Sequence, residues 1–285
     1  MQSFKPYKLG RYTIAQPWVM GILNVTPDSF YAGSRCDTPQ TVEARVRQLV
    51  DETADVIDIG ACSTRPGAEA ISAEVEMQRL TMAMRVVSDV APGIITSVDT
   101  YRAEVAQFAV EQLGVGMVND ISGGTLDPRM FQTIAQLQVP YVLMHMRGTP
   151  ETMQQLTHYD NIVEDVVNEL RDRLDVLRDM GVRDVVIDPG FGFAKTLEQN
   201  YRLMAQLDAF HSLDAPLLVG VSRKSMIYKA LGCGPEEALN GTTVLNTIAL
   251  LAGAHILRVH DVAAAVQART LVQCTIDNSF SMPRL

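Results

Sequence analysis

The sequence predicts an α/β fold, a single (β/α)8 or TIM barrel, because eight short apolar runs alternate with helical segments and each run closes on a polar residue. Continuous runs of Val, Ile and Leu are typical of parallel strands that are buried on both faces. The runs and their closing residues are 19–23 with Asn24, 56–57 with Asp58, 94–98 with Asp99, 115–118 with Asn119, 141–144 with His145, 185–187 with Asp188, 217–221 with Ser222 and 256–257 with Arg258. Residues at the carboxyl ends of barrel strands form the active site, so these closing residues are the candidates for chemistry.

Helical patterns fill the intervals between the runs. We expect helices at 39–53, 72–90, 102–113, 127–138, 159–180, 198–211, 235–252 and 262–274, and Pro39, Pro128 and Pro235 stand where a first helical turn accepts proline. Residues 1–17 predict a small hairpin or lead-in that closes the bottom of the barrel. Because no linker divides the chain, residues 1–285 are expected to form one domain.

Composition excludes several classes of protein. A formal net charge of −9 over 285 residues argues against a general nucleic-acid or membrane surface, since both need clustered cations. The four cysteines form no metal-binding or disulfide pattern, and no signal peptide or membrane span is predicted, so we expect a cytoplasmic protein. The cations at or beyond strand ends are Arg65, Arg223, Lys224 and Arg258, and they favour an anionic small molecule as the ligand.

The closing residues divide by chemistry. Asp99, Asn119 and Asp188 offer acceptors for a flat, nitrogen-rich heterocycle, because a carboxylate can pair with an aminopyrimidine edge in a bidentate manner. A second set suits a phosphorylated group: Asn24, Arg65, Arg258 and His260. The segment 188–193 adds glycines that allow close approach of backbone, and aromatic rings that can stack. Long polar connections at 26–39 and 61–70 follow the first two strands and are typical of substrate loops.

These residues stand in a series of motifs that resembles the bacterial dihydropteroate synthases, pterin-binding barrels, from about residue 18 to about residue 270. The motifs are GILNVTPDSF at 21–30, DIG at 58–60, STRPG at 63–67, SVDT at 97–100, NDISGG at 119–124, LMHM at 143–146, DPGFGF at 188–193, SRKS at 222–225 and RVHD at 258–261. The resemblance implies condensation of 6-hydroxymethyl-7,8-dihydropterin diphosphate with 4-aminobenzoate, which gives dihydropteroate and pyrophosphate in folate synthesis. It also implies a target of sulfonamides and a homodimer formed through the later helices.

The resemblance further assigns roles to individual residues. The implied pterin site comprises Asp99, Asn119, Asp188 and Lys224, with Ile121 and Phe193 as apolar walls and Arg258 against the ring. Asn24 is the implied protein ligand of Mg2+, an ion that keeps waters and rarely sits in an all-protein cage. The implied diphosphate contacts are Thr64, Arg65, Arg258 and His260, and the implied border of the aminobenzoate pocket is Phe30, Pro66, Lys224 and Ser225.

Ionisation of the pterin diphosphate needs charge stabilisation at both ends of the breaking carbon–oxygen bond more than it needs a protein nucleophile. We therefore expect Asp99 to stabilise the pterin cation. The other residues with an expected catalytic role are Arg65, Lys224, Arg258 and His260, and the aromatic amine then attacks with little assistance. Asp58 is expected to position its loop, and His145 and Ser222 receive no role.

Two positions depart from the family pattern. Ala32 and Cys62 stand where the family usually has acidic residues, in the loops that shape the second-substrate pocket. These two departures leave open a non-catalytic relative that keeps the fold. A pterin-binding barrel that transfers a methyl group from methyltetrahydrofolate to a corrinoid also stays open, because it shares the fold and the pterin carboxylates. The cations near the strand ends favour the synthase over the methyltransferase, which needs no diphosphate site.

Overall fold

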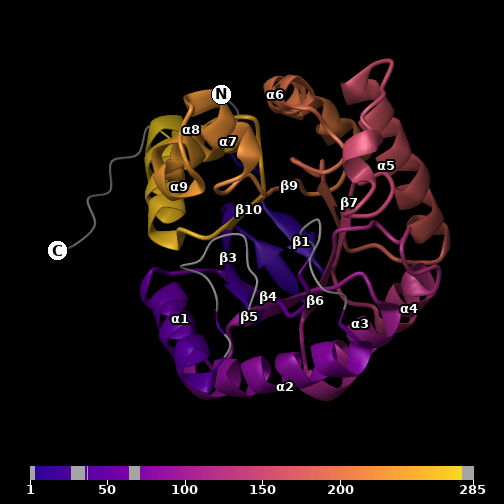
Figure 1. The fold of residues 1–285 in the computed structure, drawn as a ribbon, viewed down its shortest axis with the longest axis vertical. Coiled ribbons are helices and arrows are strands. Elements are labelled where there is room, and N and C mark those ends of the chain that lie inside the picture. The colour runs from indigo at the N-terminus through magenta and orange to yellow at the C-terminus, as the bar shows by residue number, and fades with distance from the viewer. Residues whose placement is uncertain (1–3, 27–35, 37, 64–70, 278–285) are drawn as a thin grey trace.

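The computed structural model describes residues 4–26, 36, 38–63 and 71–277, and it confirms the (β/α)8 barrel. Eight parallel strands surround the centre of the molecule, and helices form an outer ring (Figure 1). In chain order the strands are β3 (Trp18–Asn24), β4 (Val56–Gly60), β5 (Ile95–Asp99), β6 (Met117–Asp120), β7 (Tyr141–Met144), β8 (Val185–Asp188), β9 (Leu218–Val219) and β10 (Ile256–Val259). The first and last pair directly, since Ile256 of β10 stands opposite Trp18 of β3, and a parallel bridge between Ile187 and Leu217 joins β8 to the start of β9.

The helices follow the strands in the expected alternation. They are α1 (Pro39–Asp51), α2 (Ala73–Val90), α3 (Ala103–Leu113), α4 (Met130–Leu137), α5 (Ile162–Asp179), α6 (Leu197–Ala205), α7 (Ser225–Leu231), α8 (Leu239–Leu251) and α9 (Val262–Asp277), with short 3-10 segments η2 (Met153–Gln155), η3 (Leu207–Leu213) and η4 (Pro235–Glu237). Helix α1 begins as its sequence predicts, because the Thr38 side chain accepts from the backbone N–H of Thr41 and Pro39 occupies the first turn.

The helices of the structure differ from the predicted ones at two places. The helix expected at 198–211 is divided into α6 and η3, because Gln206 leaves helical geometry with φ −128° and ψ 36°. Helix α7 was not predicted at all. It has only seven residues, too few for a hydrophobic period to stand out, and it ends at Gly232 in the left-handed conformation.

The N-terminal hairpin closes the end of the barrel opposite the polar strand ends. Strands β1 (Tyr7–Leu9) and β2 (Tyr12–Ile14) pair antiparallel, and the side chains of Leu9 and Ile14 are fully buried. They pack in a cluster with residues at the beginnings of the barrel strands, namely Met20, Val56, Met117, Val142, Val186, Leu218 and Ile256. The expected lead-in is therefore a plug. Across the residues that the structure describes, none of the helices combines the length and the apolar character needed to span a membrane.

Candidate active site

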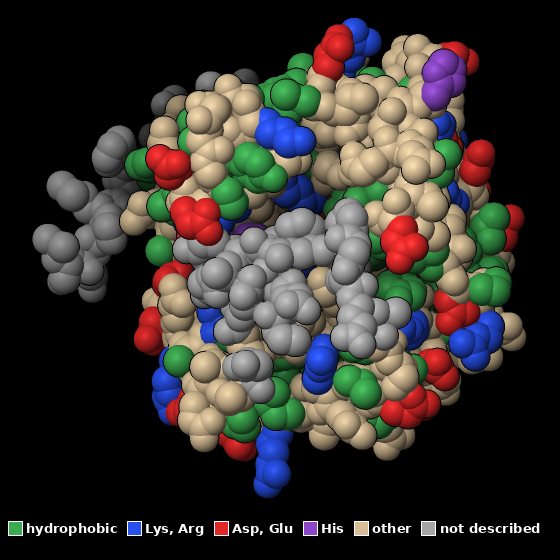
Figure 2. Space-filling model, viewed as in Figure 1, with side chains coloured by type: hydrophobic (Ala, Val, Ile, Leu, Met, Phe, Trp, Pro, Cys, Tyr) green, Lys and Arg blue, Asp and Glu red, His purple; other side chains and the backbone are tan. Residues whose placement is uncertain are grey.

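A cavity of about 310 Å³ opens at the carboxyl ends of the barrel strands. Figure 2 shows basic side chains recessed near the middle of this face. Ten of the residues selected from the sequence line this one cavity: Asn24, Asp99, Asn119, Ile121, Asp188, Phe193, Lys224, Ser225, Arg258 and His260. The others, Phe30, Thr64, Arg65 and Pro66, lie outside the described residues, as does Ala32, whereas Cys62 lines the cavity.

An ion-pair triad joins two residues of the cavity lining, Asp99 and Arg258, to the fully buried Asp58. The Arg258 guanidinium on β10 donates from Nε to Asp58 Oδ2 and from Nη2 to Asp99 Oδ2, each at 2.6 Å. The same Asp58 oxygen accepts from Nδ2 of Asn119 at 2.9 Å, while the other oxygen, Oδ1, is buried without a partner. The Asp58 carboxylate thus holds Arg258 and Asn119 in place. The loop-positioning role expected of Asp58 from the sequence concerns a loop whose residues 64–70 lie outside the described residues.

The Asp58 and Asp99 carboxylates share the Arg258 cation, and the pKa of Asp99 is shifted. Burial has the largest effect on the pKa of Asp99 and raises it. Arg258 lowers this pKa and Asp58 raises it, and the pKa of Asp99 is about 7. Burial works against the charge on Arg258, but Asp58 and Asp99 together raise its pKa above the ordinary value. Arg258 therefore remains a permanent cation, whereas Asp99 can change its charge near neutral pH.

The segment after β8 is folded tightly around Asp188. The Asp188 carboxylate accepts from the backbone N–H of Gly190 at 2.7 Å, and Gly190 adopts φ +70°. A side chain at Gly190 would collide with the carbonyl oxygen of His145, so only glycine fits there. Burial raises the pKa of Asp188, although the nearby Lys224 ammonium lowers it.

Lys224 closes the other side of this segment. Its Nζ donates to the carbonyl oxygen of Phe191 at 2.6 Å and lies 4.9 Å from the centre of the Phe193 ring. Burial lowers the pKa of Lys224 to about 8, and Asp188 opposes that shift. The amine and the ring of Phe193 are therefore held next to each other at the cavity wall, in a cation–π contact.

A buried lysine anchors the same segment from beneath. The Lys195 Nζ lies 2.8 Å from His145 Nδ1 and 3.0 Å from the carbonyl oxygens of Gly190 and Phe193. The opposite nitrogen of His145, Nε2, contacts Glu169 on α5 at 3.0 Å. Burial and Lys195 lower the pKa of His145 to about 3, so its ring is neutral. His145 thus supports the segment from below and does not line the cavity.

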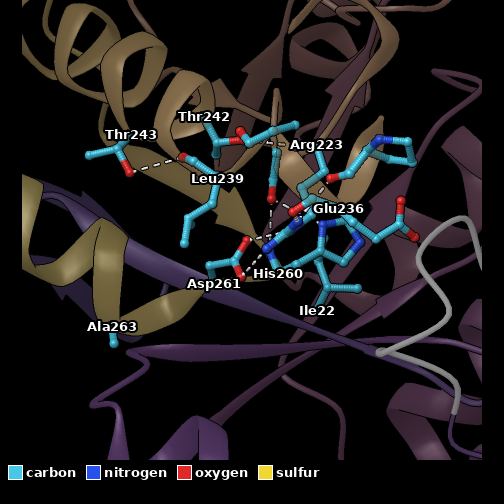
Figure 3. A network of polar contacts seen from close by, with 12 residues as sticks. Ile22, Arg223, Glu236, Leu239, Thr242, Thr243, His260, Asp261 and Ala263 are labelled. Carbon is cyan, nitrogen blue, oxygen red and sulfur yellow. Dashed lines mark hydrogen bonds and ion pairs between the residues drawn. The ribbon is translucent and has the colours of Figure 1, made fainter. Parts of the chain in front are cut away.

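A third polar cluster surrounds His260, at the end of β10. Arg223 makes a two-pronged ion pair with Asp261, from Nε and Nη2 at 2.8 and 2.9 Å, and donates to the carbonyl oxygens of Pro235 and Glu236 (Figure 3). Arg223 therefore fixes η4 against the end of β10, which is a structural use of a cation that the sequence had suggested for the ligand. Burial and the Arg258 cation lower the pKa of His260 to about 3, which leaves its imidazole neutral.

Asn24 ends β3 at the edge of the cavity, beside Gly60 at the end of β4. A Cβ atom at position 60 would lie 3.2 Å from Asn24 Oδ1 and 3.8 Å from Asp99 Oδ2, so glycine keeps open the space that these oxygens flank. The amide oxygen is a hard ligand of the kind Mg2+ accepts. Among the described residues no three His, Cys, Asp or Glu side chains form a metal cluster, so an ion here would complete its shell with ligand oxygens and water.

Two supporting residues escaped the sequence analysis. Lys195 stands two residues after the motif at 188–193, yet nothing in its spacing distinguishes a buried lysine from a solvated one. Arg45 lies on α1, far along the chain from the strand ends, and its Nη2 donates to the backbone carbonyl of His260 at 2.6 Å. A basic residue on the buried side of an amphipathic helix was the one signal available for Arg45.

Comparison with known proteins agrees with this geometry. A family model described as "Pterin binding enzyme" matches residues 20–260. A dihydropteroate synthase of Synechocystis is 44% identical over 256 residues, which are 88% of this chain and 87% of that protein. The similarity therefore extends over the whole barrel.

Solved structures with the same architecture are dihydropteroate synthases with bound small molecules. A Yersinia pestis dihydropteroate synthase in complex with a sulfonamide drug has a TM-score of 0.89 and 34% identity, and the match covers 96% of this chain and 100% of that one. A Xanthomonas albilineans dihydropteroate synthase with 4-aminobenzoic acid has a TM-score of 0.83 and 39% identity, with 95% and 96% covered.

Proposed function

The chain belongs to the pterin-binding enzyme family, among the dihydropteroate synthases, and from that premise we propose how its own residues perform the condensation. The enzyme is a transferase of folate synthesis that joins 6-hydroxymethyl-7,8-dihydropterin diphosphate to 4-aminobenzoate and releases pyrophosphate. The observation that carries the assignment of roles is the cavity itself, which brings the acceptors Asp99, Asn119 and Asp188 together with the cations Lys224 and Arg258.

The acceptors and the apolar wall define the proposed pterin site. Asp99, Asn119 and Asp188 accept hydrogen bonds from the amino and ring N–H groups of the heterocycle. Ile121 is 5% exposed and packs in a cluster with Met144 and Phe193, which supports its use as a flat wall of the site. Lys224 and Arg258 complete the site as donors to ring acceptors, and Arg258 is held in its position by Asp58.

The proposed reaction separates charge in the cavity. When the carbon–oxygen bond at the pterin methylene breaks, its electron pair leaves with the diphosphate and the positive charge spreads into the ring. The Asp99 carboxylate stabilises that cation, while Arg65, Arg258 and His260 stabilise the leaving anion. The neutral amine of 4-aminobenzoate then forms the carbon–nitrogen bond with its lone pair and releases one proton.

We propose that Mg2+ binds the diphosphate at Asn24. The ion would neutralise charge on the leaving group, with the Asn24 amide oxygen as its ligand from the protein. The space that Gly60 keeps open beside this oxygen supports the assignment.

The second substrate enters next to the pterin in this proposal. Ser225 and Lys224 line the cavity where α7 begins, and Phe30 and Pro66 are assigned to the same region through the family resemblance. Cys62 lines the cavity as well, so the replacement of the family's usual acidic residue lies within reach of this substrate.

We also propose that the enzyme is a homodimer that associates through its later helices. An apolar stripe is exposed on α8, formed by Val244, Ile248 and Leu251, which recur at the spacing of one helix face. Leu231 of α7 and Leu271 of α9 are exposed too, and α8 and α9 pack side by side. Exposed apolar residues concentrated on neighbouring helices favour association with a second copy.

A reconstituted assay tests the function directly. Purified enzyme receives the pterin diphosphate, Mg2+ and 4-aminobenzoate, and both pyrophosphate and dihydropteroate are followed. We expect the two products in equal amounts. Pterin binding without either product would contradict the synthase and indicate the non-catalytic relative, whereas methyl transfer from methyltetrahydrofolate to a corrinoid would indicate the methyltransferase.

A further inference from the structure

Ser222 contacts His260 twice with a single hydroxyl. Its Oγ accepts from the backbone N–H of His260 at 3.1 Å and lies 3.0 Å from the ring nitrogen Nδ1. Ser222 follows β9 and is 5% exposed, and β9 pairs in parallel with β10, which leads into His260. Figure 3 shows the His260 ring within the cluster that Arg223 and Asp261 stabilise.

The hydroxyl has one proton to donate, and its destination follows from the remaining contacts. The backbone N–H already donates to Oγ, and His260 Nδ1 is the other partner of this oxygen among the residues that the structure describes. The Ser222 proton therefore points to Nδ1, which acts as an acceptor. A neutral imidazole carries a single N–H, so that proton belongs on Nε2.

Two further observations hold the ring in this state. The backbone carbonyl of His260 accepts from Arg45 Nη2 at 2.6 Å, so both backbone groups of the residue are fixed. Burial, Arg258, Arg45 and Arg223 all lower the pKa of His260, against the opposing effect of Asp261, to about 3. Burial, together with the surrounding permanent cations, thus keeps the ring neutral.

We propose that Ser222 is a positioning residue that fixes His260 as the Nε2–H tautomer, so that His260 offers a neutral N–H donor to an anionic oxygen bound in the cavity. That the anion is the leaving diphosphate rests on the proposed function, whereas the tautomer does not. The Nε2–H tautomer has no lone pair on Nε2, so His260 serves as a donor and neither as a base nor as a metal ligand through that atom.

Nitrogen NMR tests the tautomer without any turnover. The full-length enzyme is labelled with 15N-histidine, and long-range proton–nitrogen spectra at pH 7 distinguish protonated from bare ring nitrogens. The variant H260Q identifies the His260 signals. We expect a protonated Nε2 and a bare Nδ1 in the wild type, the same pattern in S222T, and an averaged mixture of tautomers in S222A. An Nδ1–H form or an imidazolium in the wild type would overturn the proposal, as would an unchanged spectrum in S222A.

Binding of inorganic pyrophosphate tests the use of that donor. We expect S222A to weaken pyrophosphate about tenfold, the effect of one misoriented hydrogen bond to a charged group, while the affinity for 4-aminobenzoate stays within twofold. S222T should restore the wild-type value, which a general loss of structure would not allow, and thermal melting of each variant checks the fold. Altered NMR signals with unchanged pyrophosphate affinity would refute the donor role. If neither the wild-type enzyme nor any variant shows turnover, the proposed function is refuted, whereas the NMR result on the tautomer stays valid.

Discussion

Arg258 reaches Asp99 across the interior of the barrel, with Nη2 of the guanidinium 2.6 Å from Oδ2 of the carboxylate. Strands β5 and β10, which carry these residues, are separated in the sheet by β3 and β4, so the ion pair spans the open end of the barrel instead of joining neighbouring strands. The pair thereby links the proposed pterin site to the end of the cavity where His260 lies.

Loss of the guanidinium should affect both stability and catalysis. In R258M the buried carboxylate of Asp58 and that of Asp99 lose their shared cation, which we expect to cost about 3–5 kcal/mol of unfolding free energy. Turnover should fall by about 10²-fold or more, because Arg258 is also proposed to stabilise the leaving group. R258K should rescue little, since one ammonium cannot reproduce the two-pronged geometry. Denaturant unfolding and steady-state kinetics measure both effects. The control is R47M, which removes an exposed ion pair with Glu43 on α1 and should change neither quantity.

Asp99 should control the acid side of the pH–rate profile. Because its pKa is raised to about 7, the ionised form that stabilises the cation is lost as the pH falls through neutrality, whereas an ordinary aspartate stays ionised well below that range. We expect the turnover rate to decrease tenfold per pH unit below about 6. D99N should lower the turnover rate by about 10²-fold, a larger change than in KM for the pterin diphosphate, and its pH–rate profile should lack the acid limb. A D99N enzyme with wild-type turnover would refute the role.

Lys195 should affect pterin binding without touching it. K195M removes the three contacts that hold His145 and the carbonyls of Gly190 and Phe193, so the segment around Asp188 loses its anchor. We expect KM for the pterin diphosphate to rise about tenfold, equivalent to about 1.4 kcal/mol of binding free energy, with KM for 4-aminobenzoate unchanged. K229M on the exposed surface of α7 is the matched control. An equal rise in both KM values would indicate a general loss of structure.

Asn24 should set the requirement for Mg2+. N24A should raise the Mg2+ concentration for half-maximal activity by about tenfold or more, the effect of losing one metal ligand, whereas N24D keeps an oxygen ligand and should retain low-concentration activation. Titration of activity with Mg2+, and of pyrophosphate binding with and without the ion, measures this directly. Identical Mg2+ dependence in N24A and the wild type would contradict the assignment.

Charges on α8 should dissociate the proposed dimer. Val244 is 50% exposed and Ile248 lies one turn further along the same face, so V244E/I248E places two carboxylates in the expected interface. Sedimentation should show a dimer for the wild type and a monomer for this variant. V176E on α5 is the control, because Val176 is 48% exposed but lies away from the stripe. A wild-type monomer at micromolar concentration would exclude the dimer.

The sequence predicted most of the barrel because a strand buried on both faces leaves an uninterrupted apolar run. Strand β7 (Tyr141–Met144) coincides with its predicted run, and β4 (Val56–Gly60) extends three residues beyond the run at 56–57 because Ile59 continues the buried pattern beyond Asp58. Helix α7 was not predicted because two helical turns give too little hydrophobic periodicity.

Site residues were predictable where the residue type and its place in the sequence indicate its chemistry. They were less predictable where the role depends on a contact with another residue. Asp99, Asn119 and Asp188 were identified by their place at strand ends. The sequence did not identify Asp58 as a partner of Arg258, because the two residues are 200 positions apart and only barrel closure brings them together. The protonation of Asp99 and Lys195 depends on burial, which a linear sequence does not display.

The N-terminal hairpin provides an attachment point at the end of the barrel opposite the cavity. Because β1 and β2 seal the end of the barrel remote from the cavity, a surface or a fused protein attached through the hairpin turn would leave the cavity facing the solvent. Gly10 and Arg11 form that turn, and Gly10 is tied down by its N–H bond to Asp184 at 2.6 Å, so a graft at Arg11 offers a firm anchoring point for an immobilised catalyst or a biosensor.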